Sequence, residues 1–447
     1  MSKSLLHKLK GLLAEEPISL HVPGHKNMTI GYLNQLDFKM DMTEITGLDD
    51  LHSPESVIAE SMKNVDKHPD YDAYYLVNGT TSGILSVIQA FSSKNGEYAI
   101  ARNVHKSVFH ALDLIKAKAQ LLKMDVSDVT NQYLGPNKTS LYDQVKDSKL
   151  AVFTYPNYYG ECFDIKTVME CLKSLKIPTL IDEAHGAHLG LEHFPETTLN
   201  LGADYVVQSY HKTLPSLTMS SVIFIHKNAP YREEVIKYLS YFQSSSPSYL
   251  LMSSLELAQK FYEDYNSECF FQKREQLIQQ LKSKEFEVIE VDDPLKINIR
   301  YKGYNGYELQ SYFETQHIYV ELADDLQVLM VLPLWHEDDQ YPFDELLSRI
   351  EDIQLVERQW DINTSIPYRT ESSVYYGGEI QQVRKIDIKY AKNKILANHI
   401  VPYPPGIPLM FKGEKITEDM VKLMDYWCEH HQSVEGIKNL KIEIKDE

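Results

Sequence analysis

Three groups of polar residues, in a fixed chain order, carry the chemistry that this sequence suggests. Residues 78–83 form a run of small and hydroxyl side chains, Asp182 ends an apolar run, and Lys212 follows another apolar run. A lysine amine forms a Schiff base with an aldehyde, and a carboxylate can keep a pyridine nitrogen protonated. Backbone N–H groups at the start of a helix hold a phosphate. Pyridoxal phosphate needs all three, so the combination predicts a site for this cofactor.

Each group taken alone has an ordinary structural explanation. A Gly-rich turn with a Ser or Thr helix cap, a solvated Asp and an exposed Lys at strand ends are all common. His185 and His188 follow Asp182 at a spacing that a metal site could also use, but the sequence offers no further ligand cluster and no H-E-x-x-H motif. We therefore base the prediction on the order of the three groups, and we predict no metal site.

The elements that must position these residues alternate between about residues 75 and 226. Short β-rich runs and helical patterns follow one another there, which is typical of βαβ units around a mostly parallel sheet. Because ligands of such sheets bind at the carboxyl ends of strands, Asp182 and Lys212 are expected at one edge. The expected strands are 74–77, 98–101, 151–155, 178–182, 205–208 and 221–225, and the expected helices are 82–91 and a second one from 104 to 122.

The pattern changes near residue 260, where charged helical stretches such as 272–285 and β-like runs at 297–301 and 327–334 begin. A terminal helix is expected from Thr417, with Met420, Met424 and Trp427 on one face. We thus expect three parts along the chain. They are an N-terminal segment (1–16), a cofactor-binding major domain of the α/β class with a central, mostly parallel sheet (17–260), and a smaller α+β C-terminal domain (261–447).

Composition narrows the function classes. The 64 acidic residues exceed the 45 basic ones and give a net charge of −19, which argues against binding to nucleic acid or to an anionic membrane. The four cysteines form no C-x-x-C pair, and no run of about 18 apolar residues is present. We expect a cytoplasmic protein without a signal peptide or membrane span.

Further motifs extend the pattern over nearly the whole chain. They are His-Val-Pro-Gly-His-Lys (21–26), Gly-Leu-Asp-Asp-Leu-His (47–52), Arg-Asn-Val-His-Lys-Ser (102–107), Asp-Glu-Ala-His-Gly (182–186), Ser-Tyr-His-Lys-Thr-Leu-Pro (209–215) and Pro-Tyr-Pro-Pro-Gly-Ile-Pro (402–408). With these motifs the chain resembles the short form of the ornithine/lysine/arginine decarboxylases, which have the aspartate-aminotransferase-like fold (fold type I). The resemblance implies pyridoxal-phosphate-dependent decarboxylation of a basic L-amino acid to an amine and CO2, as in polyamine biosynthesis. Arginine is the first choice of substrate, and lysine or ornithine the next.

The resemblance also implies roles for individual residues. Lys212 is expected to carry the Schiff base, Asp182 to pair with the pyridine nitrogen, and His105 to stack on the cofactor ring. Ser245, within the segment 244–246, is expected to reach the phosphate of a neighbouring subunit, which implies a homodimer with shared sites, although a plain Ser-rich loop is an open alternative. The other expected cofactor contacts are Gly79, Thr80, Thr81, His185, Ser209 and His211. The candidates for binding the distal cation of the substrate are Glu44, Asp49 and Asp50.

The sequence departs from the family pattern at Asn27-Met28, where a glycine is expected, and at Met219, where the family often has glutamine. These departures bear on substrate specificity. Two other functions stay open. An aminotransferase or another lyase of the same fold would need an arginine for the substrate α-carboxylate, and Arg300, Arg369 and Arg384 lie in no recognisable motif. The second open function is that of a non-catalytic homologue that binds pyridoxal phosphate, because resemblance to a family indicates the fold more reliably than the activity.

Overall fold

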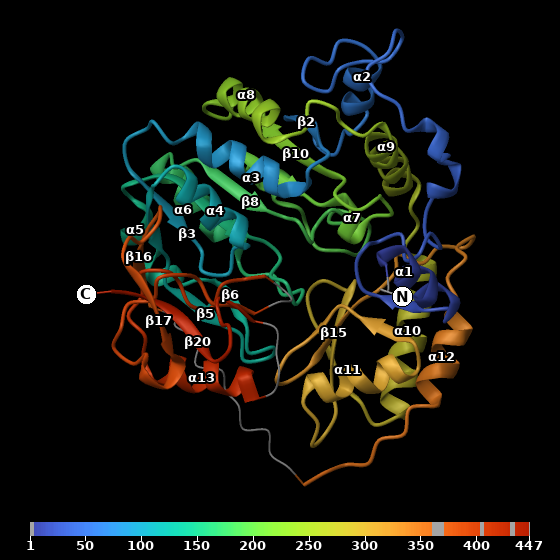
Figure 1. The fold of residues 1–447 in the computed structure, drawn as a ribbon. Coiled ribbons are helices and arrows are strands. Elements are labelled where there is room, and N and C mark those ends of the chain that lie inside the picture. Colours follow the sequence, from blue (N-terminus) through green and yellow to red (C-terminus); the bar gives the residue numbers. More distant parts are fainter. Residues whose placement is uncertain (1–3, 360–370, 403–405, 430–433, 447) are drawn as a thin grey trace.

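A computed structural model describes residues 4–359, 371–402, 406–429 and 434–446. Its centre is an eight-stranded sheet in the order β16-β4-β3-β7-β8-β9-β10-β2 (Figure 1). The block from β4 to β9 is parallel, β10 runs antiparallel to both of its neighbours, and β16 runs antiparallel to β4. The predicted α/β fold with a mostly parallel sheet is confirmed. The strands are β2 (Tyr71–Leu76), β3 (Glu97–Ile100), β4 (Lys118–Leu121), β7 (Ser148–Thr154), β8 (Thr179–Asp182), β9 (Tyr205–Gln208), β10 (Ser221–His226) and β16 (Ser373–Tyr376).

The expected strands agree with the observed ones because these runs are almost wholly buried, as strands covered on both faces require. The expected helix from 104 to 122 is wrong in its second half. Helix α4 (Lys106–Leu114) ends before Lys116, whose φ of 52° lies in the left-handed region, and residues 118–121 form β4. Ala119 and Leu121 are both buried two positions apart, which is the period of a strand and not of a helix.

Helix α3 (Gly79–Ala90) packs on one face of this sheet with its neighbours α4 and α8 (Arg232–Phe242) (Figure 1). Gly83 allows the close approach, since a Cβ there would lie 2.9 Å from Leu76 Cδ1 and 3.0 Å from Val207 Cγ1. The N-terminus of α3 is thereby held near the strand ends.

A second sheet, entirely antiparallel, has the order β11-β12-β15-β14. In addition, β1 (Ile18–Leu20) pairs in parallel with β13 (Ile318–Val320). This pairing brings Val22, just after β1, next to Glu321, just after β13. The strands of this region are β11 (Glu287–Glu290), β12 (Lys296–Arg300), β14 (Leu322–Ala323) and β15 (Val328–Val331), and its helices are α9 (Tyr249–Asp264), α10 (Glu268–Ser283), α11 (Gly306–Thr315) and α12 (Phe343–Glu351).

The C-terminal segment has its own hydrophobic cluster, between Ile388 and Ile444, around α13 (Glu418–Glu429). Thr417 caps this helix by accepting from the Met420 N–H at 3.2 Å. The expected apolar face is confirmed, because Met420, Met424 and Trp427 are buried. Strand β17 (Val383–Asp387) pairs with β20 (Lys441–Lys445) beside it. The expected domain boundaries after residues 16 and 260 stay predictions.

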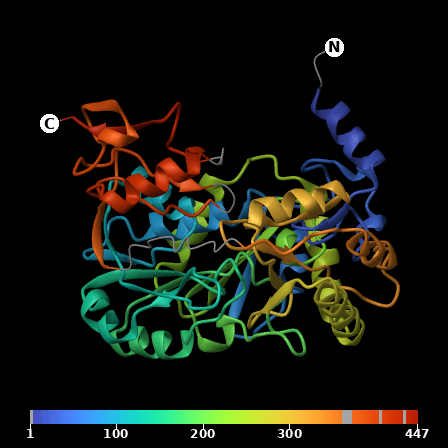
Figure 2. The same ribbon diagram turned by 90° about the horizontal axis from the view of Figure 1, so that it is seen from below.

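The C-terminal segment and the second sheet with its helices lie next to each other at one end of the molecule (Figures 1 and 2). Among the residues that the structure describes, no helix is both long enough and apolar enough to cross a bilayer. The same residues contain no group of His, Cys, Asp and Glu side chains arranged to hold a metal ion.

Candidate active site

Lys212 lies in the one-turn helix α7 (Tyr210–Thr213), directly after β9. Its Nζ is 3.0 Å from Nε2 of His185. Burial lowers the pKa of Lys212, while the charges of Asp182 and Glu321 act in the opposite direction. A lowered pKa leaves more of the amine neutral, which is the form that attacks a carbonyl carbon. The surroundings of Lys212 therefore suit a nucleophilic amine.

Asp182 is the last residue of β8, the parallel neighbour of β9. The structure thus brings Asp182 and Lys212 to the same edge of the sheet. The carboxylate of Asp182 is buried and accepts from the Ala184 N–H at 3.1 Å. Burial raises its pKa, and the charge of Lys212 works against that rise. A buried carboxylate of this kind needs a cationic partner, and a protonated pyridine nitrogen is such a partner.

Several buried polar atoms around these two residues have no hydrogen-bond partner within the described residues. Nδ1 of His185, Oγ1 of Thr154 and Oγ1 of Thr213 are among them, and Thr154 is in register with Asp182 across β7 and β8. Because buried polar atoms are normally satisfied, they indicate that a polar group belongs here. Pyridoxal phosphate, with ring nitrogen, phenolic oxygen and phosphate, fits this set of atoms.

The expected phosphate cradle lies at the start of α3. Gly79 begins the helix with φ of +74°, and no atom lies within 4 Å of where its Cβ would be. Thr80 Oγ1 is 3.3 Å from Oγ of Ser209, so the cradle meets the loop that carries Lys212. Thr81 follows in the first turn and is partly buried. The free N–H groups and the dipole of this helix end favour a phosphate at this position.

Two more histidines lie close to Lys212. His105 caps α4, accepting from the Ser107 N–H at 3.3 Å, and burial followed by the charge of Lys212 lowers its pKa to about 3. His211 has Nδ1 3.0 Å from the carbonyl oxygen of Ser220, and burial lowers its pKa to about 4. Both rings are therefore neutral near pH 7, and a neutral ring can lie against a cofactor face without a charge penalty.

The segment 21–26 packs directly on the lysine loop. The N–H of Gly24 donates to the carbonyl oxygen of His211 at 2.7 Å, and a Cβ at Gly24 would lie 2.5 Å from the carbonyl oxygen of Leu214. Lys26 is fully enclosed and donates to the carbonyl oxygen of Val331 at 2.9 Å. This motif therefore acts as a backbone support for the loop of Lys212.

The structure does not bring the expected acidic residues to Lys212. Asp49 accepts backbone N–H groups at the start of α2 (Val57–Lys63), including that of Ser56 at 2.8 Å, and so serves as a local cap. Glu44 and Asp50 are exposed. Within the described part of the chain, none of the three contacts Lys212. Their predicted role in substrate binding stays untested.

The Ser-rich segment 244–246 is partly tied to its own subunit. The N–H of Ser244 donates to Oδ1 of Asn78 at 3.3 Å, and its carbonyl oxygen lies 2.7 Å from Nε2 of His52. Ser245 itself is exposed. The loop therefore lies beside the phosphate cradle of the same chain, and its predicted reach into a neighbouring subunit stays a prediction.

Sequence reasoning missed several residues near Lys212. Glu321 accepts from the Val22 N–H at 2.9 Å and from the Tyr158 hydroxyl, and the Tyr158 ring lies 4.3 Å from that of His185. Tyr158 follows an expected strand, so the strand-end rule could have found it. No local signal identifies Glu321, because the pairing of β1 with β13 brings it here.

His188, weighed above as a metal ligand, is instead paired with Asp293. Its Nε2 is 2.9 Å from Oδ1 of Asp293, whose Oδ2 lies 3.9 Å from Nζ of Lys296. All three side chains are fully buried. Burial lowers the pKa of Lys296, and Asp293 counteracts this. These three residues form a buried network, and the charge of Lys296 contributes to the lowered pKa of His185.

Comparison with known proteins gives consistent matches. A family model described as the major domain of Orn/Lys/Arg decarboxylases matches residues 4–299, and the model of their C-terminal domain matches residues 368–439. The uncharacterized protein YaaO of Bacillus subtilis is 36% identical and aligns over 96% of this chain and 94% of its own length. The arginine decarboxylase of Bacillus subtilis is 26% identical over 92% of this chain and 91% of its own length.

Solved structures share the fold. The lysine decarboxylase LdcF of Francisella novicida superposes with a TM-score of 0.72 at 18% identity, covering 92% of this chain and 75% of that one. A NifS-like protein from Rickettsia africae superposes with a TM-score of 0.51 at 14% identity, over 66% of this chain and 87% of that one.

Proposed function

Because the chain belongs to the Orn/Lys/Arg decarboxylase family, and is thus a pyridoxal-phosphate-dependent amino-acid decarboxylase of fold type I, we propose that its substrate is a basic L-amino acid. L-Arginine is the first choice, and L-lysine or L-ornithine the next. The position of Lys212, with Nζ 3.0 Å from His185 and near the charges of Asp182 and Glu321, supports the Schiff-base chemistry. The choice of a basic substrate rests on the family match. The alignment with an arginine decarboxylase over 92% of the chain favours arginine.

The bound cofactor would supply an electron sink for the electron pair that the departing CO2 leaves behind. Lys212 would provide the amine that the substrate amine displaces, and His185, kept neutral by burial, lies where it can orient Nζ. Asp182 would hold the proton on the pyridine nitrogen. The neutral ring of His105 would cover one face of the cofactor, and the first turn of α3 from Gly79 would hold the phosphate.

We further propose a cytoplasmic homodimer that acts in polyamine biosynthesis, with Ser245 reaching the phosphate site of the partner. Shared sites would account for an exposed Ser-rich segment beside the cradle. Sedimentation of the holoenzyme, together with complementation between Lys212→Ala and Ser245→Ala subunits in one dimer, tests this part. Restored activity in the mixed dimer supports shared sites, and inactivity of every mixture contradicts them.

Product analysis tests the substrate. Purified protein with pyridoxal phosphate is incubated separately with L-arginine, L-lysine and L-ornithine, and the products are identified by mass spectrometry, with Lys212→Ala as the blank. We expect the amine from arginine to form fastest, and only with the intact enzyme. A keto acid without amine would instead support an aminotransferase. Cofactor fixed to Lys212 by borohydride, without turnover of any of the three, would support a non-catalytic homologue.

A further inference from the structure

Lys67 lies between α2 and β2, outside all the family motifs, and its amine contacts two separate parts of the site. Its Nζ donates to the carbonyl oxygen of Ala187 and, at 3.0 Å, to Oε1 of Gln208. Ala187 belongs to the loop after β8, two positions after His185. Gln208 is the last residue of β9 and stands four positions before Lys212. One ammonium group therefore joins the loop after β8 to the end of β9.

Two aromatic rings pack against the same ammonium. Nζ of Lys67 lies 4.7 Å from the ring centroid of Tyr210 and 4.1 Å from that of Tyr262. Tyr210 is the first residue of α7, the one-turn helix that contains Lys212, and it is fully buried. Tyr262, in α9, donates to the carbonyl oxygen of Leu189 at 3.0 Å, further along the loop after β8. Because a cation is attracted to the faces of aromatic rings, Lys67 also helps to fix α7.

A buried carboxylate lies near this cation. Glu183 follows Asp182 directly, is fully buried, and accepts from Nε2 of Gln208 at 2.8 Å and from Oγ1 of Thr197 at 2.9 Å. Burial lowers the pKa of Lys67 to about 7, and the charge of Glu183 acts in the opposite direction. Lys67, Gln208 and Glu183 thus form one hydrogen-bonded chain. It crosses between β8 and β9 at the edge of the sheet where Asp182 lies.

The two parts that Lys67 joins meet again at the reacting amine. Nε2 of His185, in the loop after β8, is 3.0 Å from Nζ of Lys212, in the helix after β9. Bond formation between two held groups is sensitive to their placement, and a shift of about 1 Å can cost about 100-fold. Among the described residues, Lys67 makes no hydrogen bond or ring contact with α3, which carries the expected phosphate cradle. Lys67 should therefore affect the covalent bond to Lys212 more than it affects binding of the phosphate.

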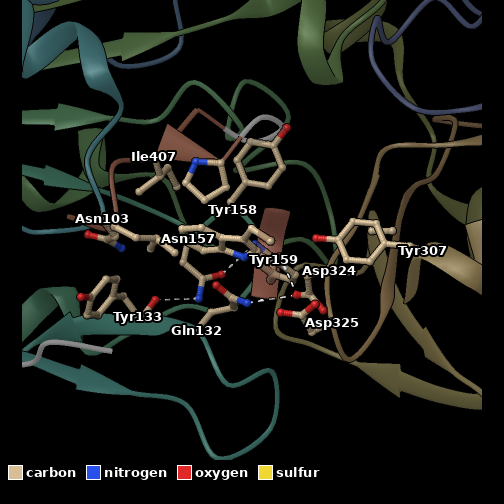
Figure 3. A pocket seen from close by; sticks show the side chains of 14 residues that line it. Asn103, Gln132, Tyr133, Asn157, Tyr158, Tyr159, Tyr307, Asp324, Asp325 and Ile407 are labelled. Carbon is tan, nitrogen blue, oxygen red and sulfur yellow. Dashed lines mark hydrogen bonds between the residues drawn. The ribbon is translucent and has the colours of Figure 1, made fainter. Parts of the chain in front are cut away.

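Tyr158 also packs against His185, with 4.3 Å between the ring centroids, and it lines the pocket shown in Figure 3. Neither Lys67 nor its partners Ala187 and Gln208 belong to the described lining of that pocket. A change at Lys67 therefore leaves the walls of the pocket as they are, and it reaches Lys212 through the two parts of the chain that it joins.

We propose that Lys67 is a positioning residue, which places the amine of Lys212 by joining the loop after β8 to the end of β9. The inference rests on the proposed role of Lys212 as the lysine that forms the Schiff base, and it does not depend on which amino acid is the substrate. Methionine in place of Lys67 keeps the length of the side chain but leaves the oxygens of Ala187 and Gln208 without their donor. The loop and the strand end then lose their shared contact.

The test measures how tightly two forms of the cofactor bind to the full-length protein after its own cofactor has been removed. Pyridoxal phosphate can form the bond to Lys212, whereas pyridoxine phosphate has the same ring and phosphate with an alcohol in place of the aldehyde. Lys67→Met should raise the Kd of pyridoxal phosphate at least about 10-fold, equivalent to about 1.4 kcal/mol, and that of pyridoxine phosphate less than about 2-fold. The control Lys63→Met makes the same substitution at an exposed position of α2 and should change neither Kd.

A Lys212→Ala background separates positioning from a purely structural role. Without the amine no Schiff base forms at this position, so adding Lys67→Met there should change the Kd of pyridoxal phosphate less than about 2-fold. Thermal unfolding shows whether each variant folds. If Lys67→Met does not fold, Lys67→Gln, which keeps an N–H donor but loses the charge and the reach, takes its place with the same expectation.

The loss expected from Lys67→Met is selective, and an unselective result overturns the proposal. Equal losses for the two cofactor forms, an undiminished loss in the Lys212→Ala background, or unchanged binding of pyridoxal phosphate would each do so. If Lys212→Ala binds pyridoxal phosphate as tightly as the wild type, both the role of Lys212 and this inference are wrong. A selective loss in a protein that forms no amine from L-arginine, L-lysine or L-ornithine supports the role of Lys67 and contradicts only the proposed substrate.

Discussion

The ion pair between Arg102 and Glu414 joins the end of β3 to the C-terminal cluster, and removing its charge should loosen that cluster selectively. Nη2 of Arg102 is 2.7 Å from Oε1 of Glu414, with side chains 0% and 4% exposed. Arg102 also donates to Oγ of Ser373 at 2.7 Å. Taking away one partner of a buried pair costs about 3–5 kcal/mol, because the other charge is left buried and uncompensated.

The change to make is Glu414→Gln. At about 1.36 kcal/mol per factor of ten, the expected cost corresponds to roughly 150- to 5000-fold faster hydrogen exchange in segments that open with the cluster. The amides of α13 and β20 report on that opening, and the amides of β7 in the central sheet report on the rest. Exchange mass spectrometry of the holoenzyme measures both.

Two controls make the result interpretable. Glu418→Gln breaks the pair with Lys392, in which both side chains are more than half exposed, and should change exchange less than about 5-fold. The double variant Arg102→Met with Glu414→Leu should recover part of the loss, because it leaves no unpaired charge. The reasoning is refuted if Glu414→Gln changes exchange of α13 by less than 5-fold, or if β7 loses protection to the same extent.

Three other predictions concern the site and its supports. The pKa of His105 is lowered to about 3 from an ordinary 6.5, so the native state binds fewer protons than the unfolded state, and the free energy of unfolding falls as the pH drops from 6.5 toward 3. Thermal scans should show that the wild type loses about 2 kcal/mol more than His105→Gln between pH 7 and pH 5. Equal losses would contradict this. Gly24→Ala would place a Cβ 2.5 Å from a carbonyl oxygen of the lysine loop and should reduce cofactor content measured by absorbance, whereas Gly11→Ala, with open space around it, should not. Asp49→Ala removes the cap of α2 and should lower stability by about 1–2 kcal/mol in thermal unfolding, with the exposed Asp50→Ala as the matched control; equal effects would show that the cap contributes nothing.

The sequence alone predicted the strands correctly where a local pattern of apolar residues determines the secondary structure. Buried apolar runs located β8 and β9, and the rule that ligands bind at strand ends then placed Asp182 and Lys212 together. The sequence-based prediction was wrong where the same apolar residues fit both the helix period and the strand period. Ala119 and Leu121 are examples, since they lie in a strand and not in the expected helix. A turn at Lys116 with positive φ decides between the two.

Residues that reach the site through distant pairing could not be predicted. Glu321 carries no motif and arrives because β13 pairs with β1, nearly three hundred positions earlier. The prediction that Glu44, Asp49 and Asp50 bind the substrate rested on charge and stays untested. The structure adds that the carboxylate of Asp49 accepts several backbone N–H groups, which charge alone does not reveal.

The pairing of β1 with β13 also sets an order of events during synthesis. Residues 18–26 leave the ribosome early, yet their partners, 318–331, are made about three hundred residues later. At about 5–20 residues per second that interval lasts roughly 15–60 s. The residues that hold segment 21–26 in place are therefore absent while most of the central sheet is already available to fold. A nascent chain of this protein would gain its cofactor late, and capture of the cofactor would report the completion of folding rather than its start.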